Sequence, residues 1–145
     1  MKHPKYPVAA NDEYNMYQFF SDGPKGKIAK RVIYSHIGRN LYNLGFGDWD
    51  EERRQLNDFN RTNNGDRDKV LATVAFTALD FTSKVPDVKI FVEGSTSART
   101  RLYQMGIAYN LMEIKVNFEV NGLLFNGWEP FQPGRNYDAF LIYRK

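Results

Sequence analysis

The chain contains no cysteine and only two histidines, His3 and His36. The lack of cysteine excludes disulfides, thiolate nucleophiles, iron–sulfur clusters and cysteine-ligated zinc, and two histidines are too few for a histidine-rich metal centre. The sequence also has no regularly spaced series of Asp and Glu of the kind that forms a calcium-binding loop. We therefore predict no metal site and no bound cofactor.

The chain also lacks long apolar segments. Its first residues, MKHPKYPVAANDEY, contain no apolar core of the signal-peptide type, and no run approaches the length of a membrane span. The net charge of +3, from 20 basic and 17 acidic residues, is a small excess that allows an anionic partner without requiring one. These features predict a soluble, cytoplasmic protein with no membrane association.

Aromatic residues are plentiful, with 11 Phe, 9 Tyr and 2 Trp among 145 residues, and such richness favours a sheet. The length suggests a single domain over residues 1–145, in which the polar, proline-containing residues 1–13 form an extended arm. The amide-rich, charged residues 50–66 are expected to form a long surface loop.

Apolar periodicity predicts two main helices, because Val70, Val74 and Phe81 repeat at helical spacing and Leu102, Met105 and Tyr109 do so again. Strands are predicted where aromatic and β-branched residues gather between turn signals. The fold class is therefore α+β, with one central, mostly antiparallel sheet of about six strands. The expected helices are residues 68–83 and 97–110, and the expected strands are residues 14–20, 27–36, 41–49, 88–92, 114–120 and 137–143.

The segment 94–101, GSTSARTR, is the strongest candidate site. It follows a predicted strand and opens a predicted helix, whose free N–H groups carry partial positive charge. Serine and threonine hydroxyls add donors, and arginine matches phosphate or carboxylate geometry. In the alternative interpretation, Ser97 only caps the helix and the arginines pair with surface carboxylates. The predicted anion-binding residues are Ser95, Thr96, Ser97, Arg99 and Arg101.

A second candidate is a group of basic residues around the first predicted hairpin, with aromatic residues nearby in sequence. Basic and aromatic side chains together can hold single-stranded nucleic acid by charge and stacking. The alternative is that these residues divide between a solvated face and a core face. The nucleic-acid candidates are Lys25, Lys27, Lys30 and Arg31.

Two resemblances to known families add to this interpretation. The strings FSDGPKGKI, YNLGFGD, DKVLATVA, GSTSARTRLY and RNYDAFLIYRK are similar to an uncharacterised bacterial family of unknown function across nearly the whole chain. That resemblance implies no activity.

Residues 66–107 resemble the core of a GNAT-type acetyltransferase, and Leu102-Tyr103 with Gly106-Ile107 match the ending of one of its helices. The resemblance implies a GNAT-like topology and a general-acid role for Tyr103. The family's glycine-rich cofactor loop is replaced by residues 64–68, NGDRD, whose two carboxylates would repel a pyrophosphate.

Three functions follow from these features. The first is a non-enzymatic or regulatory protein that binds a phosphate-bearing ligand or a protein partner at the 94–101 turn. The second is a divergent acyltransferase that uses Tyr103. The third is a toxin–antitoxin or phage-conflict component that acts on RNA.

Overall fold

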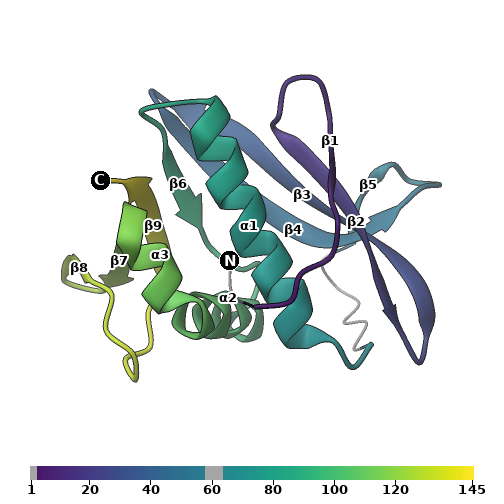
Figure 1. Ribbon diagram of the computed structural model, residues 1–145. Coiled ribbons are helices and arrows are strands. Elements are labelled where there is room, and N and C mark those ends of the chain that lie inside the picture. The colour runs from purple at the N-terminus through teal and green to yellow at the C-terminus, as the bar shows by residue number, and fades with distance from the viewer. Residues whose placement is uncertain (1–2, 58–63) are drawn as a thin grey trace.

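A single mixed sheet with helices on one face forms the body of the protein in a computed structural model, which describes residues 3–57 and 64–145 (Figure 1). Within these residues the sheet has nine strands and is accompanied by three helices. Eight strands lie in the order β1-β2-β3-β4-β6-β9-β7-β8, and β5 pairs separately with β4.

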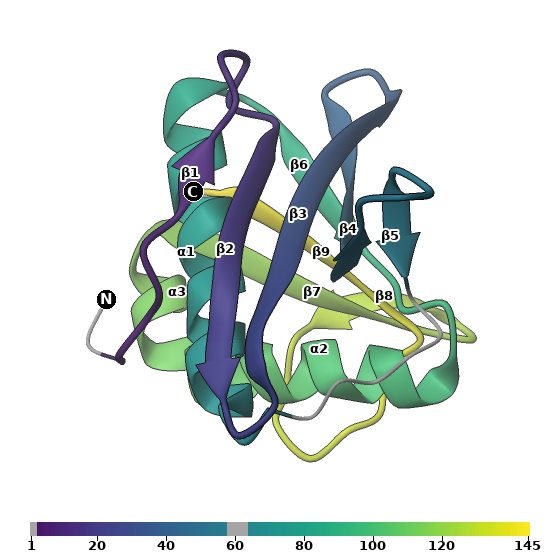
Figure 2. The same ribbon diagram turned by 90° about the vertical axis from the view of Figure 1, so that its right-hand side faces the viewer.

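The first half of the sheet is an antiparallel meander. It consists of β1 (Ala9–Ala10), β2 (Met16–Gly23), β3 (Gly26–Gly38), β4 (Leu41–Asp50) and β5 (Gln55–Asn57). The hairpin between β2 and β3 closes at the pair Gly23 and Gly26, and Gly26 has a φ of +86°, a backbone conformation that glycine adopts without strain. Figure 2 shows β2, β3 and β4 side by side, with α1 behind them.

Helix α1 (Arg67–Lys84) carries the chain back across the sheet to β6 (Lys89–Val92). Because of this crossover, β6 runs parallel to β4, whereas the other neighbouring strands pair antiparallel. The chain continues through α2 (Ser97–Tyr109), α3 (Leu111–Asn117), β7 (Phe118–Leu124), β8 (Gly127–Pro130) and β9 (Ala139–Arg144). Strand β9 inserts between β6 and β7.

The core lies between α1 and the helix-facing side of the sheet. Val74, Phe81 and Ile90 are all buried, as the periodicity of residues 68–83 predicts. The Phe81 ring stacks on the Tyr34 ring with 4.3 Å between centroids and meets the Tyr42 ring edge-on at 5.1 Å. The sequence prediction of this helix and of its buried face is therefore confirmed.

Three buried threonines on α1 make hydrogen bonds to distant parts of the chain. The Thr73 hydroxyl accepts the backbone N–H of Tyr6 at 2.9 Å. The hydroxyls of Thr77 and Tyr34 are 2.8 Å apart, and Thr82 accepts the Arg144 Nε–H at 2.9 Å. Helix α1 thus joins the N-terminal arm, the centre of the sheet and the C-terminal strand.

The predicted fold class is wrong. We expected an α+β fold of GNAT-like topology, with a mostly antiparallel sheet of about six strands and two main helices, but the structure has nine strands in one mixed sheet and three helices in the described residues. The additional strands β1, β5 and β8 have two to four residues, which is too short to show an alternating pattern. Strand β5 lies within residues 50–66, which we expected to form a loop, and residues 58–63 lie outside the described residues.

Two local predictions are also wrong. Residues 114–117, expected to begin a strand, belong to α3, and the strand starts only at Phe118. The expected inward stripe of α2 does not face the core, because Met105 and Tyr109 are each about two-fifths exposed. Helix α2 instead buries its other side, including Tyr103, Gly106 and Ile107.

Candidate functional site

An open cleft of about 1050 Å³ lies between β3 and β4, the start of α1 and one side of α2. Figure 1 shows α2 beside the N-terminal half of α1, which brings the two helices to the same end of the sheet. The lining includes five basic and three acidic side chains. They are Lys30, Arg67, Lys69, Arg99 and Arg101, with Asp48, Asp66 and Asp68.

The start of α1 is held in place by a buried polar cluster. The Asp66 carboxylate accepts hydrogen bonds from Tyr6 Oη and Ser21 Oγ, each at 2.5 Å, and makes no capping bond to its own helix. The Asn64 amide donates to Ser21 Oγ at 3.2 Å and to the Gly26 carbonyl at 2.8 Å. Burial and the hydrogen bond to Asp66 raise the pKa of Tyr6. The first turn of α1 therefore lines the cleft in a position determined by β2 and the arm.

On the sheet side, Lys30 and Asp48 form an ion pair with 2.5 Å between Nζ and Oδ1. Lys30 is only 6% exposed, and its ammonium lies 5.9 Å from the centre of the Phe46 ring. Since the pair is mostly shielded from water, each charge requires the other to offset its desolvation. This pair stabilises the wall of the cleft and contributes little net charge to it.

Helix α2 brings two arginines to the cleft, and both are anchored. Arg99 is buried, and its Nη2 donates to the Phe46 carbonyl oxygen at 2.8 Å. Arg101 donates from Nη1 to Gln104 Oε1 at 2.6 Å and from Nη2 to the Tyr137 carbonyl oxygen at 2.5 Å. The acceptors of Arg101 are neutral, so they hold its guanidinium group while leaving its charge in place.

The remaining part of the α2 wall is apolar. Leu102, Met105 and Tyr109 line the cleft, and the Tyr109 ring stacks against His3 of the arm with 4.0 Å between ring centroids. The residues expected to face the core therefore face an open cleft. A ligand in this cleft would meet charged groups and an apolar surface together.

The structure separates the predicted anion-binding residues. Arg99 and Arg101 line the cleft, whereas Ser95, Thr96 and Ser97 are exposed and are absent from its described lining. The Thr96 hydroxyl caps α2 by accepting the Arg99 backbone N–H at 3.2 Å. Thr96 is therefore the cap of α2. The alternative interpretation, in which Ser97 caps this helix, is wrong on that point.

The predicted nucleic-acid group is separated as well. Lys25 and Lys27 are exposed at the β2–β3 hairpin. The Lys30 side chain points to the helix side of the sheet, as does Val32 two residues further along β3. Arg31 points to the opposite face, where its guanidinium lies 3.8 Å from the centre of the Trp49 ring and its Nε donates to Gln18 at 2.7 Å. The four side chains do not form one basic surface.

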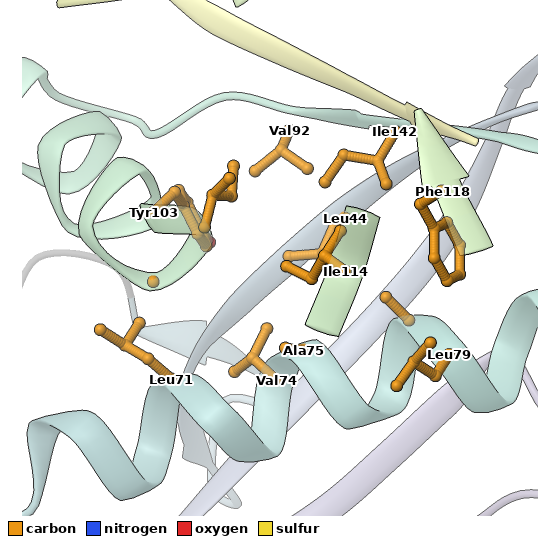
Figure 3. Close-up of a pocket in the computed structure, with 13 residues that line it drawn as sticks. Leu44, Leu71, Val74, Ala75, Leu79, Val92, Tyr103, Ile114, Phe118 and Ile142 are labelled. Carbon is orange, nitrogen blue, oxygen red and sulfur yellow. The ribbon is translucent and has the colours of Figure 1, made fainter. Parts of the chain in front are cut away.

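Tyr103 lies on the buried side of α2 and lines a separate internal cavity of about 60 Å³. Figure 3 shows Tyr103 from α2, Val74 from α1 and Leu44 from β4 around this space. Aliphatic and aromatic side chains form almost all of its lining. The proposed general-acid role of Tyr103 stays a prediction, since the open cleft is lined by other α2 residues.

Sequence reasoning missed Arg67 and Lys69 as cleft residues. Lys69 places its ammonium 4.2 Å from the centre of the Tyr6 ring, and Arg67 lies 3.8 Å from Asp68. Their position at the start of the helix predicted over residues 68–83 was the available signal. The described residues contain no group of three or more His, Cys, Asp or Glu side chains that could hold a metal ion, and none of the described helices could cross a membrane.

Comparison with known proteins gives a family without an assigned activity. The match covers residues 2–145, nearly the whole chain. The chain belongs to DUF6934, a family of unknown function. No curated protein and no solved structure matches the chain. The resemblance to an uncharacterised family is thereby confirmed, whereas the GNAT resemblance of residues 66–107 is not shown by these comparisons.

Proposed function

We propose that the cleft binds an anionic small molecule that carries a phosphate and an apolar or aromatic part, and that the protein serves as a non-enzymatic ligand-binding or regulatory module. The observation that carries this proposal is the position of Lys69 and Arg101. They line the same cleft from α1 and α2, and neither has an ion-pair partner within residues 3–57 and 64–145.

The balance of charges supports an anion over a cation. Asp48 is paired with Lys30, and Asp66 accepts two short hydrogen bonds from hydroxyl groups. Lys69 and Arg101 therefore keep positive charge that the described acids do not neutralise. A guanidinium already oriented by Gln104 and the Tyr137 carbonyl loses little freedom on binding.

The α1 N-terminus adds to this preference. The first N–H groups of a helix have no partner within the helix and carry partial positive charge. Asp66 does not cap them with its side chain. Asp68 opposes an anion there but lies beside Arg67, so we place the phosphate nearer Lys69 and Arg101 than the helix end itself.

The apolar wall supports a ligand with more than a phosphate. Met105 and Tyr109 expose about two-fifths of their surface on the cleft side of α2, next to the cationic groups. Covering these side chains with an apolar group would remove them from water, which favours binding by about 25 cal/mol per Å². We therefore expect an aromatic phosphate to bind more tightly than inorganic phosphate.

Calorimetric titration with 1-naphthyl phosphate and with inorganic phosphate tests the proposal. We expect 1-naphthyl phosphate to bind more tightly, K69Q to weaken both probes by about fivefold or more, and M105Q to weaken only the naphthyl compound. K115Q on α3 is the matched control, because Lys115 is exposed and does not line the cleft. Absence of binding by either probe, or equal weakening by K115Q and K69Q, would overturn the proposal.

A further inference from the structure

The face of the sheet that points away from the helices carries the second surface of interest. Residues from α1, α2 and α3 enclose the internal cavity together with Val92 and Ile142, so all three helices pack on the side of the sheet to which these residues point. Side chains alternate along a strand, and Phe91 and Leu141 therefore point to the opposite side. Figure 1 shows α3 in front of β7 and β9, and no helix behind these strands.

The opposite face carries a group of apolar side chains around Asn121 of β7, which pairs with Leu141 of β9. Phe91 on β6 is the direct neighbour of Leu141 on β9, and Leu123 on β7 is the direct neighbour of Trp128 on β8. The Phe91 and Trp128 rings meet edge-on with 6.4 Å between centroids, and Trp128 is still 46% exposed. An uncovered sheet face of a protein in water is normally polar, so a contiguous group of this kind marks an interaction surface. We call Phe91, Leu123, Trp128 and Leu141 the outer apolar patch.

A row of three residues beside the patch gives the surface its particular charge pattern. Tyr143 on β9 is paired on one side with Lys89 of β6 and on the other side with Glu119 of β7. All three point to the outer face, by alternation from Phe91 and Leu141. Lys89 and Glu119 are exposed, and the Lys89 ammonium lies 4.9 Å from the centre of the Tyr143 ring. Opposite charges therefore occupy equivalent positions on the two sides of β9.

From this pattern we propose that the outer apolar patch is a homodimer interface, in which a second copy of the chain packs face to face about a two-fold axis parallel to β9. Such an axis places β9 over β9 and β6 over β7 of the other copy. Lys89 of each copy then meets Glu119 of the other, the two Leu141 side chains meet at the axis, and Phe91 lies over Asn121 of the other copy. Sheets that pack face to face lie about 10 Å apart, a distance that lysine and glutamate side chains can bridge together.

The self-complementarity favours a second copy over a different protein. A two-fold interface requires that each residue of the surface meet a suitable residue of the same surface. Lys89 and Glu119 satisfy this requirement because they have opposite charge and lie at equal register from the central strand.

Charge reversal tests this arrangement. In K89E, glutamates of the two copies would face each other at two places, and in E119K lysines would face each other at the same two places. Both variants should therefore dimerise more weakly, because like charges across an interface oppose association. We expect sedimentation equilibrium to show a dimer of the unaltered chain at about 100 µM or below, and each single variant to have a dissociation constant raised at least about tenfold. K115E, a reversal on the helix side, should leave the dimer unchanged.

Mixing the two variants gives the sharpest result. In a K89E–E119K heterodimer, the glutamate introduced in one copy would meet the lysine introduced in the other. The native Lys89 and Glu119 would meet at the second contact, so both contacts become attractive again. An equimolar mixture should therefore form heterodimers with an affinity close to that of the unaltered chain.

Circular dichroism of each variant checks that the fold is kept. A monomeric unaltered chain, or variants that associate no better mixed than alone, would overturn the proposal.

Discussion

The Nη2 group of Arg99 on α2 donates a hydrogen bond to the carbonyl oxygen of Phe46 on β4, with 2.8 Å between the two atoms. The bond connects residues 53 positions apart in sequence, and Arg99 is 8% exposed. Arg99 therefore attaches α2 to the sheet as well as lining the cleft.

Replacing Arg99 by alanine should lower the free energy of unfolding by about 1.5–3 kcal/mol, the usual range for hydrogen bonds to charged groups. Urea denaturation measures the effect. Arg39→Ala is the matched control, since Arg39 is exposed in the β3–β4 turn, and should change stability by no more than about 0.5 kcal/mol. Equal effects of the two changes would show that the contact to Phe46 does not stabilise the fold.

Phe81 should be among the most sensitive core positions. It is 1% exposed and packs against both Tyr34 and Tyr42, so Phe81→Ala should cost about 3–5 kcal/mol through lost burial and the cavity left behind. Phe125→Ala is the matched control, because Phe125 is 98% exposed. A cost below about 1 kcal/mol at Phe81 would contradict the packing described for α1.

The internal cavity offers a stabilising change. Val74 lines it and is 6% exposed, so Val74→Ile would add one methylene group to unfilled apolar space. We expect a gain of up to about 0.8 kcal/mol in thermal or urea denaturation. Val116→Ile, on the exposed side of α3, makes the same chemical change without filling a cavity and should have no comparable effect. Destabilisation by Val74→Ile would mean that the cavity cannot accept the added group.

Stability should fall in alkaline solution. Burial and the hydrogen bond to Asp80 raise the pKa of Tyr17 above its ordinary value of 10.0, and burial does the same for Tyr34. The unfolded chain therefore releases these protons near pH 10 while the folded chain retains them. The stabilisation is complete below that pH and is lost as the pH rises toward the folded-state pKa values.

Tyr17→Phe tests this dependence. Urea denaturation between about pH 9 and pH 11 should show a decrease that is shallower in the variant, by up to about 1.4 kcal/mol per pH unit above pH 10. The comparison concerns the slope, because loss of the 2.8 Å bond to Asp80 also lowers the overall stability. An identical slope in both proteins would contradict the raised pKa of Tyr17.

Long periodic elements could be predicted from the sequence, whereas three of the short strands, β1, β5 and β8, could not. The stripe of Val70, Val74 and Phe81 identified α1 within one residue at each end. Strands β1, β5 and β8 form because longer neighbours offer unpaired edges or hairpin partners, which is a tertiary effect. The parallel pairing of β4 and β6 also depends on the path of α1 and not on local sequence.

The candidate site was predicted in part. Arg99 and Arg101 could be identified because a strand, a turn and a helix start are recognisable at residues 92–97. Both residues line the cleft. Leu102, Met105 and Tyr109 were assigned to the core because helical periodicity identifies an apolar face without saying whether protein or solvent covers it. Lys69 was missed because the cleft joins α1 and α2, whose packing could not be derived from either helix alone.

The buried threonines of α1 give the two ends of the chain a common point of attachment. Thr73 bonds to the arm through Tyr6, and Thr82 bonds to the last strand through Arg144. Each hydroxyl also donates to a carbonyl oxygen of its own helix, so it joins the chain end to the helix backbone. Serine, which keeps the hydroxyl, should be better tolerated than valine at both positions, although valine has the closer shape. We therefore expect hydrogen-bonding capacity to constrain these two positions more strongly than side-chain volume.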